Sequence, residues 1–205
     1  MTRPIRPRRL APSLLSADFA QLGAAIAAAE SGGADAFHLD VMDGHFVPNL
    51  SFGPALVKAV RARTQRPLDI HLMIEHPQKY ARAFAEAGGD TLVFHLESQD
   101  EPSEVVRTVK ELGVAVGAAL RPETPIARAA PILDRLDQLL VMSVHPGFSG
   151  QSFLPEALPK LEEACRALGA IGSPADLSID GGVGVETARR AAGAGATFVV
   201  CGNSV

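Results

Sequence analysis

The feature that most constrains the fold of this sequence is a regular alternation of short apolar runs with longer segments of helical spacing. Eight apolar runs are typical of β-strands, at residues 10–14, 36–41, 68–74, 91–95, 114–120, 138–144, 177–180 and 197–201. Seven intervening segments are typical of helices, at residues 19–30, 54–63, 78–87, 102–112, 125–133, 155–168 and 185–194. Strands separated by helices of this length predict βαβ units and a parallel sheet.

Eight such strands can close into a barrel or form an open, doubly wound sheet. The nearest approach to the dinucleotide fingerprint of an open sheet is Gly-Val-Gly at residues 182–184, and Thr187 stands in place of its third glycine. Polar residues at the strand ends favour the barrel, which collects its active site at that rim. We therefore predict a single (β/α)8 barrel domain over residues 1–205, with residues 1–8 as a flexible N-terminal tail.

Composition excludes several classes of protein. With 47% hydrophobic and 20% charged residues, the chain can bury a core, and its net charge of −4 gives no reason to expect nucleic acid as a partner. No apolar run approaches the roughly 20 residues that cross a membrane. Two cysteines are too few for a disulfide framework, so we expect a cytoplasmic protein.

Polar and ionisable residues lie at or near the carboxyl ends of the predicted strands: Ser13, His38, Asp40, Asp43, His71, His95, His145 and Asp180. His38 and Asp40 are two residues apart on one strand and therefore share a face. Each histidine or aspartate alone has an ordinary structural explanation, as a hydrogen-bonded side chain or a turn residue. Together, His38, Asp40, His71 and Asp180 favour a site for one divalent metal ion. Without a thiolate, Zn, Fe(II), Mn and Co all suit this donor set.

Glycine-rich loops follow the last three predicted strands, at residues 145–151, 181–182 and 202–204. Backbone N–H groups in such loops bind phosphate, and barrels often place a phosphate site after their seventh and eighth strands. Glycine is also common in turns of this kind, but three consecutive loops favour phosphate.

Three methionines, Met42, Met73 and Met142, lie at or near strand ends. Met42 is two residues beyond Asp40, and Met73 is two beyond His71, so each shares a face with a predicted ligand. Methionine commonly fills gaps in a core; here we interpret the three as a cap that excludes water from the site. We expect His95, beside Glu97, to support a ligand rather than to be one.

Several stretches resemble ribulose-phosphate 3-epimerases: Ala-Pro-Ser-Leu-Leu-Ser-Ala-Asp at residues 11–18, His-Leu-Asp-Val-Met-Asp-Gly-His-Phe-Val-Pro-Asn at 38–49, His-Leu-Met at 71–73, the loop 146–151 and Asp-Gly-Gly at 180–182. The resemblance runs from about Arg9 to the end of the chain. It implies a (β/α)8 barrel that interconverts D-ribulose 5-phosphate and D-xylulose 5-phosphate in the pentose phosphate pathway.

The resemblance also implies roles for individual residues. His38, Asp40, His71 and Asp180 would bind the metal, Asp40 and Asp180 would be the acid–base pair, and Ser13 and His71 would contact the substrate. The phosphate would be held by Gly147, Phe148, Ser149, Gly150, Gly181, Gly182, Gly202 and Asn203. Three residues depart from the family pattern near these loops, His145, Ser149 and Asn203, and they bear on which sugar phosphate binds.

The chemistry follows from the reaction itself. Epimerisation beside a ketone removes a proton from carbon and returns one to the opposite face, through an enediolate whose charge a metal ion stabilises. Two acid–base groups suffice, one ionised and one protonated, and the acid must be an aspartate whose neighbours keep it protonated. No redox cofactor is needed.

Other functions remain open from the sequence. A 3-epimerase of a related ketose phosphate such as D-allulose 6-phosphate would use the same residues, and a barrel could bind sugar phosphates without catalysis. Decarboxylases of the orotidine-phosphate type are disfavoured, because His71 stands where their strand has lysine. We expect a ketose phosphate as the substrate, no membrane partner, and a homo-oligomer. Since the eighth predicted strand ends near Cys201, we expect the native protein to continue beyond residue 205 into an eighth helix.

Overall fold

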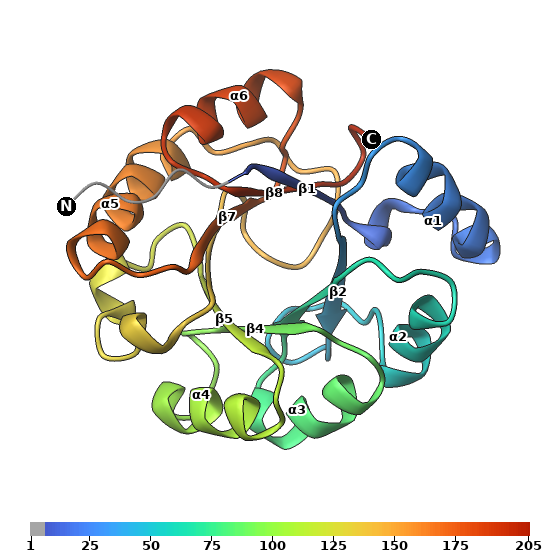
Figure 1. Ribbon diagram of the computed structural model, residues 1–205, viewed down its shortest axis with the longest axis horizontal. Coiled ribbons are helices and arrows are strands. Elements are labelled where there is room, and N and C mark those ends of the chain that lie inside the picture. The colour runs from blue at the N-terminus through green and yellow to red at the C-terminus, as the bar shows by residue number, and fades with distance from the viewer. Residues whose placement is uncertain (1–6) are drawn as a thin grey trace.

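The structure, a computed structural model, describes residues 7–205 and contains all eight predicted strands. They are β1 (Arg9–Pro12), β2 (Phe37–Met42), β3 (Leu68–Met73), β4 (Thr91–His95), β5 (Ala115–Leu120), β6 (Gln138–Met142), β7 (Asp176–Asp180) and β8 (Phe198–Cys201). Every paired strand is parallel to its neighbour, in the order β1-β8-β7-β6-β5-β4-β3-β2. Figure 1 shows these strands as a ring viewed along its axis. Residues 1–6, most of the predicted flexible tail, lie outside the described chain.

The ring closes between β1 and β2 through a thin seam. Over the described residues, no continuous ladder joins these strands; an isolated bridge pairs Ser13 with His38. At the other end of the seam, Asp35 donates its backbone N–H to Leu10 O (2.9 Å) and accepts the Leu10 N–H on its carboxylate (2.8 Å). The barrel is therefore complete, with one junction that depends on few hydrogen bonds.

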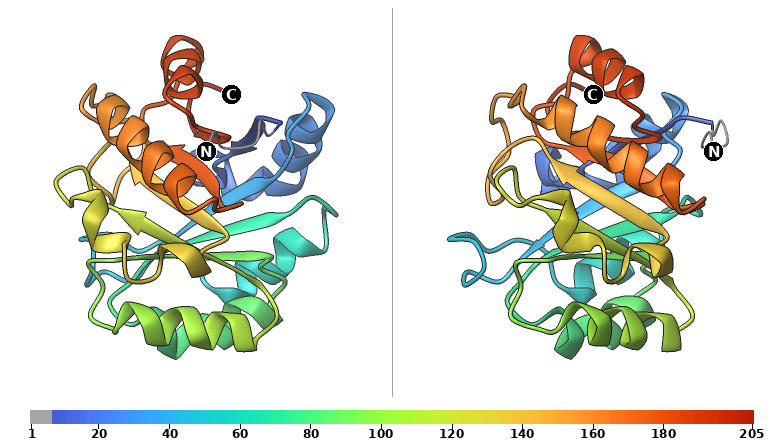
Figure 2. Two further views of the ribbon diagram at one scale, coloured as in Figure 1. Left: turned by 60° about the vertical axis from the view of Figure 1, so that its left-hand side comes forward. Right: turned by 90° about the vertical axis from the view of Figure 1, so that its left-hand side faces the viewer.

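Helices surround the ring, as Figures 1 and 2 show. They are α1 (Leu22–Ser31), α2 (Pro54–Arg61), α3 (Pro77–Glu86), α4 (Pro102–Glu111), α5 (Ala157–Ala170) and α6 (Val185–Gly193). Three of them, α2, α3 and α4, begin with proline, whose missing N–H would have no partner in a first turn. The helix α6 begins where the Thr187 hydroxyl accepts the Gly184 N–H (2.8 Å), so the residue that breaks the dinucleotide fingerprint caps a helix.

One predicted helix is wrong. In place of an α-helix at residues 125–133, the chain forms two 3₁₀ segments, Ile126–Ala129 and Leu133–Arg135. The cause is Pro131, which has no N–H to donate and whose ring clashes with the preceding turn of an α-helix. The predicted helix at residues 19–30 also begins later than expected, because Phe19–Gln21 is 3₁₀ and α1 follows it.

The core has an inner and an outer part. The outward-facing strand residues form one large cluster with the helices, which includes Leu39, Ile70 and Leu92. Inside the barrel, Val93, Ala119, Leu140, Met142 and Val144 form a separate cluster. Packing there is close: a Cβ added at Gly117 would lie 2.8 Å from Val93 Cγ2, so a side chain at that position would displace a neighbour.

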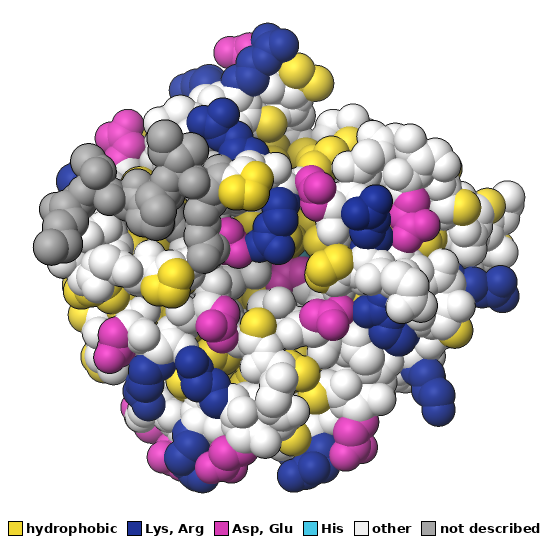
Figure 3. Space-filling view, viewed as in Figure 1, with side chains coloured by type: hydrophobic (Ala, Val, Ile, Leu, Met, Phe, Trp, Pro, Cys, Tyr) yellow, Lys and Arg dark blue, Asp and Glu magenta, His cyan; other side chains and the backbone are white. Residues whose placement is uncertain are grey.

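The surface has no dominant charge on the face seen in Figure 3, where basic and acidic side chains are interspersed. This distribution agrees with the small net charge of −4. Among the described residues, none of the helices combines the length and the apolar character needed to cross a bilayer.

Candidate active site at the carboxyl ends of the strands

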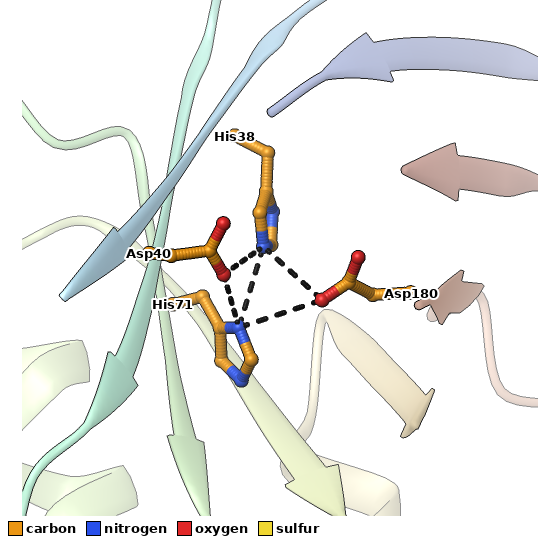
Figure 4. Close-up of side chains that lie close together, drawn as sticks. All are labelled: His38, Asp40, His71 and Asp180. Carbon is orange, nitrogen blue, oxygen red and sulfur yellow. Dashed lines mark hydrogen bonds and ion pairs between the residues drawn. The ribbon is translucent and has the colours of Figure 1, made fainter. Parts of the chain in front are cut away.

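Four side chains from three strands converge inside the barrel. His38 and Asp40 extend from β2, His71 from β3, and Asp180 from the end of β7 on the opposite side (Figure 4). One possible ligand atom of each lies within 4.8 Å of those of the other three. The four residues that the sequence predicted to meet therefore do meet. The strand parity explains half of this result, since His38 and Asp40 share the inward face of β2.

The His38 ring is held by a carboxylate behind it. His38 Nδ1 lies 2.7 Å from Oδ2 of Asp69, which also accepts the Gln138 amide (3.3 Å). Because Asp69 accepts the Nδ1–H proton, the lone pair of the neutral ring is on Nε2, which faces the centre of the cluster. His38 Nε2 lies 3.2 Å from Asp40 Oδ1 and 3.9 Å from Asp180 Oδ2.

His71 is held by a second imidazole instead of a carboxylate. Its Nδ1 faces the cluster, 3.0 Å from Asp40 Oδ1 and 3.9 Å from Asp180 Oδ2. Its Nε2 lies 2.9 Å from His95 Nε2, and His95 Nδ1 lies 3.0 Å from Glu97 Oε2. His95 thus supports a predicted ligand, as expected.

The two carboxylates of the cluster have opposite acidities. Burial alone would raise the pKa of Asp40, but attraction to His38 and hydrogen bonds with His38 and His71 outweigh burial and hold that pKa well below its usual range. Burial, followed by repulsion from Asp40, raises the pKa of Asp180 to about 6. One aspartate is therefore held ionised, whereas the other keeps its proton up to about pH 6, well above the ordinary range of an aspartate.

In the absence of a metal ion, the pKa of His38 is also shifted. Burial lowers its pKa, but the charge of Asp40 and hydrogen bonds to Asp40 and Asp69 outweigh burial and keep the pKa well above its usual range. His95 contacts His71 on the side away from the cluster, and burial lowers the pKa of His95 to about 4. Burial would raise the pKa of Glu97, but the hydrogen bond with His95 lowers it to about 2, so this carboxylate is ionised.

The donor set fits a divalent transition-metal ion. The distances between neighbouring donor atoms of the cluster run from 3.0 Å to 3.9 Å. A tetrahedral ion with bonds of about 2.0–2.1 Å has its donor atoms roughly 3.4 Å apart, within that range. Both imidazoles also have their outer nitrogen bonded, as ligands of metal ions usually do.

Ser13 contacts Asp40 from across the barrel seam. Its hydroxyl donates to Asp40 Oδ2 (2.6 Å), the oxygen turned away from the histidines. A hydroxyl that donates to a carboxylate stabilises the ionised form. The Ser13–His38 bridge between the strands brings the two side chains together.

A cavity of about 300 Å³ lies above the cluster. Its walls include Ser13, Asp40 and Asp180, together with all the residues predicted for the cap and the phosphate loops: Met42, Met73, Met142, Gly147, Phe148, Ser149, Gly150, Gly181, Gly182, Gly202 and Asn203. His38 and His71 are fully buried and do not line this cavity. The implied contact of His71 with the substrate therefore stays a prediction.

Two of the cavity glycines are required by close approach. Gly181 has φ +114° and Gly182 φ +61°, values that favour glycine. A Cβ at Gly181 would lie 2.4 Å from Val144 Cγ2, and one at Gly182 would lie 2.4 Å from Phe153 N. These glycines let the chain after β7 turn directly beneath the loop that follows β6.

The loop after β2 joins the two parts of the site. Asn49 donates its amide to Gly147 O (2.8 Å), so this loop is tied to the predicted phosphate loop after β6. Asp43, at the start of the same loop, accepts the backbone N–H groups of His45, Phe46 and Glu75, all within 2.9 Å. Asp43 is thus a loop-ordering residue outside the cluster.

The sequence analysis missed Asp69 and Asn49. Asp69 stands opposite His38 in the β2–β3 register, and its one sequence signal is a carboxylate inside an otherwise apolar strand. Asn49 acts on a residue 98 positions away, which no local pattern reports. His145, a predicted strand-end residue, lies at the surface 3.6 Å from Glu123 and is also outside the cluster.

Comparisons with known proteins agree with this geometry. A family model described as "Ribulose-phosphate 3 epimerase family" matches residues 9–205. The chain is 48% identical over 198 residues to a ribulose-phosphate 3-epimerase of Bacillus subtilis, covering 96% of this chain and 91% of that protein. It is 42% identical over 197 residues to one of Escherichia coli, covering 96% and 88%.

A solved structure supports the fold. A mutant tryptophan synthase α-subunit from Pyrococcus furiosus aligns with a TM-score of 0.72 at 17% identity, covering 96% of this chain and 87% of that one. At this identity the likeness shows the fold alone, and it confirms the predicted (β/α)8 barrel.

Proposed function

Since the chain belongs to the ribulose-phosphate 3-epimerase family, we propose that its cluster interconverts D-ribulose 5-phosphate and D-xylulose 5-phosphate. His38, Asp40, His71 and Asp180 bind one divalent metal ion, and Asp40 and Asp180 form the acid–base pair. The observation that carries this proposal is the convergence of two histidines and two aspartates on one point at a cavity, where the pKa values of the two carboxyl groups are shifted in opposite directions.

The proton transfers follow from that difference. The hydrogen on C3 is acidified by the neighbouring ketone, and the ionised Asp40 removes it from one face. Asp180, which extends from the opposite side of the barrel, donates a proton to the other face, and the two carboxyl groups exchange roles in the reverse reaction. A divalent ion held by the four residues of the cluster would supply positive charge that stabilises the negative charge of the deprotonated substrate.

Ser13 and the buried partners prepare the acid–base pair. The Ser13 hydroxyl and the two histidines hold Asp40 ionised, ready to accept the proton. The methionines Met42, Met73 and Met142 line the cavity beside these carboxylates, and their apolar side chains exclude water from the deprotonated substrate. Exclusion of water prevents uncontrolled reprotonation and strengthens the electrostatic interactions within the site.

The phosphate end of the substrate is assigned to the glycine-rich loops. These loops line the same cavity, and α6 begins at Val185, shortly after Gly181 and Gly182. Backbone N–H groups and a helix N-terminus together attract an anion. The choice among Zn, Fe(II), Mn and Co, the homo-oligomeric state, the cytoplasmic location and the single-domain organisation stay predictions.

The test compares two substrates on metal-analysed protein. A coupled assay measures kcat/KM for D-ribulose 5-phosphate and D-allulose 6-phosphate, and we expect at least a ~10-fold preference for the pentose, as one extra carbon unit in a shaped pocket is worth about 1–3 kcal/mol. The product formed in heavy water should contain deuterium at C3. A faster reaction with the hexose would assign the other substrate, and no turnover of either by metal-loaded protein would indicate a binding barrel.

A further inference from the structure

His95 and Glu97 lie behind the cluster and have no part in the proton transfers proposed above. His95 ends β4 and is fully buried, with its ring centroid 5.0 Å from that of His71 and 4.8 Å from that of Phe46. We propose that Glu97 is a positioning residue that acts through His95 to fix the tautomer of His71, which keeps the lone pair of His71 Nδ1 free for the metal ion. This inference rests on the metal site of the proposed function.

Glu97, His95 and His71 form a chain of hydrogen bonds, and Glu97 sets the direction in which its members donate. Its Oε1 accepts the backbone N–H of Arg121 (3.0 Å), and its Oε2 lies 3.0 Å from His95 Nδ1. An ionised carboxylate accepts at both oxygens and donates at neither. The proton between Glu97 and His95 therefore belongs to His95 Nδ1.

The remaining protons follow from that assignment. A neutral imidazole has one N–H donor and one acceptor, and full burial disfavours the doubly protonated ring. With its proton on Nδ1, His95 accepts at Nε2, and His71 Nε2, 2.9 Å away, must donate. When a metal ion occupies the cluster, the lone pair of His71 is then on Nδ1, the atom that faces the cluster and lies 3.0 Å from Asp40 Oδ1.

The two histidine ligands thus reach the same state by different routes. His38 donates directly to the carboxylate of Asp69, whereas His71 donates to Glu97 through one intervening imidazole. Phe46 and Arg121 hold the His95 ring in place. The Arg121 guanidinium lies 4.3 Å from the Phe46 ring centroid, and the Phe46 ring packs on His95. The contact between the Phe46 and His95 rings leaves His95 little freedom to rotate away from its hydrogen bonds with Glu97 and His71.

Glu97→Gln should reverse the direction of donation in this chain of hydrogen bonds, because glutamine has nearly the same shape as glutamate but can donate from its NH₂ group. The backbone N–H of Arg121 can only donate, so the glutamine carbonyl must take the place of Oε1 and its NH₂ group must face His95. His95 would then accept at Nδ1 and donate from Nε2. His71 would have to carry its proton on Nδ1, the atom that should bind the ion.

The experiment measures Zn²⁺ affinity by chelator competition in wild type, Glu97→Gln, Glu97→Ala and Glu123→Gln. We expect Glu97→Gln to weaken Zn²⁺ binding about 10–100-fold. Glu97→Ala should weaken it less, because alanine removes the acceptor without introducing a donor. Glu123→Gln is the control: it removes one exposed negative charge that has no contact with Glu97, His95 or His71 in the hydrogen bonds described above. Its Zn²⁺ affinity should stay within about 2-fold of wild type.

The order of the two Glu97 variants separates the inference from a purely structural role. A structural role predicts that alanine, which removes more contacts, does more harm than glutamine. Nitrogen NMR of histidine-labelled protein gives a second reading that does not depend on affinity: zinc-loaded wild type should carry the His95 proton on Nδ1, and Glu97→Gln should carry it on Nε2.

Two results would overturn the inference while leaving the proposed function intact. One is a Glu97→Gln variant that binds Zn²⁺ as tightly as wild type; the other is a Glu97→Ala variant that binds it more weakly than Glu97→Gln. If wild-type protein itself failed to bind Zn²⁺, Mn²⁺, Fe²⁺ and Co²⁺, the metal site of the proposed function would be wrong, and the inference would fall with it.

Discussion

The two ends of the barrel both contain buried carboxylates, but they use them differently. At the amino ends of the strands, a smaller cavity of about 170 Å³ is lined by Asp69, Asp137 and Asp176. There Asp137 accepts the Val116 N–H (2.9 Å), and Asp176 binds Arg9 and the Thr197 hydroxyl. At the carboxyl ends, by contrast, His38 Nε2 and His71 Nδ1 both lie 3.9 Å from Oδ2 of Asp180.

This difference teaches how to recognise the functional end. Residue type does not separate the two cavities, because aspartate occurs at both. What separates them is the arrangement of the polar groups: at the amino end Asp137 and Asp176 bind separate N–H and hydroxyl groups, whereas the carboxyl end directs four potential ligands at one point. Asp69 belongs to both ends, since it lines the lower cavity and orients His38 above it.

Removal of the acid at the upper end should have the largest effect. Asp180→Asn keeps the size of the side chain but cannot exchange a proton, and we expect kcat to fall at least ~10³-fold, within the range typical of acid–base groups. A coupled assay gives kcat, and circular dichroism of the same samples should show an unchanged fold. Turnover within 10-fold of wild type would remove Asp180 from the pair and weaken the comparison of the two ends.

The residue shared by both ends should come second. Asp69→Asn removes the carboxylate that accepts from His38 Nδ1, and we expect Zn²⁺ affinity to fall about 10–100-fold. The matched control is Asp137→Asn, at the same end of the barrel, where the carboxylate accepts the backbone N–H of Val116. Chelator competition measures both variants. Equal losses in the two would mean that charge alone, and not the orientation of His38, controls the site.

Stability of the metal-free protein should reveal the strain at Asp180. Because folding raises its pKa from 3.8 to about 6, the unfolded chain ionises first, and Asp180 reduces stability as pH rises from about 4 to about 6. Asp180→Asn lacks this loss. The Tm of the variant minus that of wild type should therefore increase by several degrees between pH 4 and pH 7, measured by calorimetry in the presence of chelator. A constant difference across this window would contradict the raised pKa.

The smallest effect is expected at the lower end. Asp176→Asn weakens contacts with Arg9 and Thr197, and since Arg9 is partly exposed the loss of stability should be about 1 kcal/mol or less. Thermal unfolding measures this loss, which corresponds to about 2–4 °C in a chain of this size. The value of kcat/KM should stay within about 2-fold of wild type. A large loss of turnover would show that the lower end also takes part in catalysis.

The sequence predicts the strands and the four-residue cluster well for identifiable reasons. Residues such as His38 and Asp40 lie on strands whose period of two assigns them a face, and the parallel barrel brings strand ends to one rim. The predicted helix at 125–133 is wrong because Pro131, in the middle of the segment, has no N–H to donate, which the spacing of the apolar residues does not reveal.

What the sequence could not supply depends on register and on loops. Asp69 lies opposite His38 only because β2 and β3 pair in one register out of several, and that register is a tertiary property. The Glu97 contact with the Arg121 N–H likewise depends on how two successive loops lie beside each other. Such contacts are decided by packing between segments, and no periodicity within a segment encodes them.

The thin seam between β1 and β2 gives the barrel a preferred place to open. A closed ring of strands distributes thermal motion around its circumference, and the least reinforced junction yields first. At this junction, the Ser13–His38 bridge is reinforced by the hydrogen bond that the Ser13 hydroxyl donates to the Asp40 carboxylate. The Asp40 carboxylate therefore also helps to hold the barrel closed. A fluctuation that opens the seam would break the hydrogen bond from the Ser13 hydroxyl, which orients Asp40 as the base.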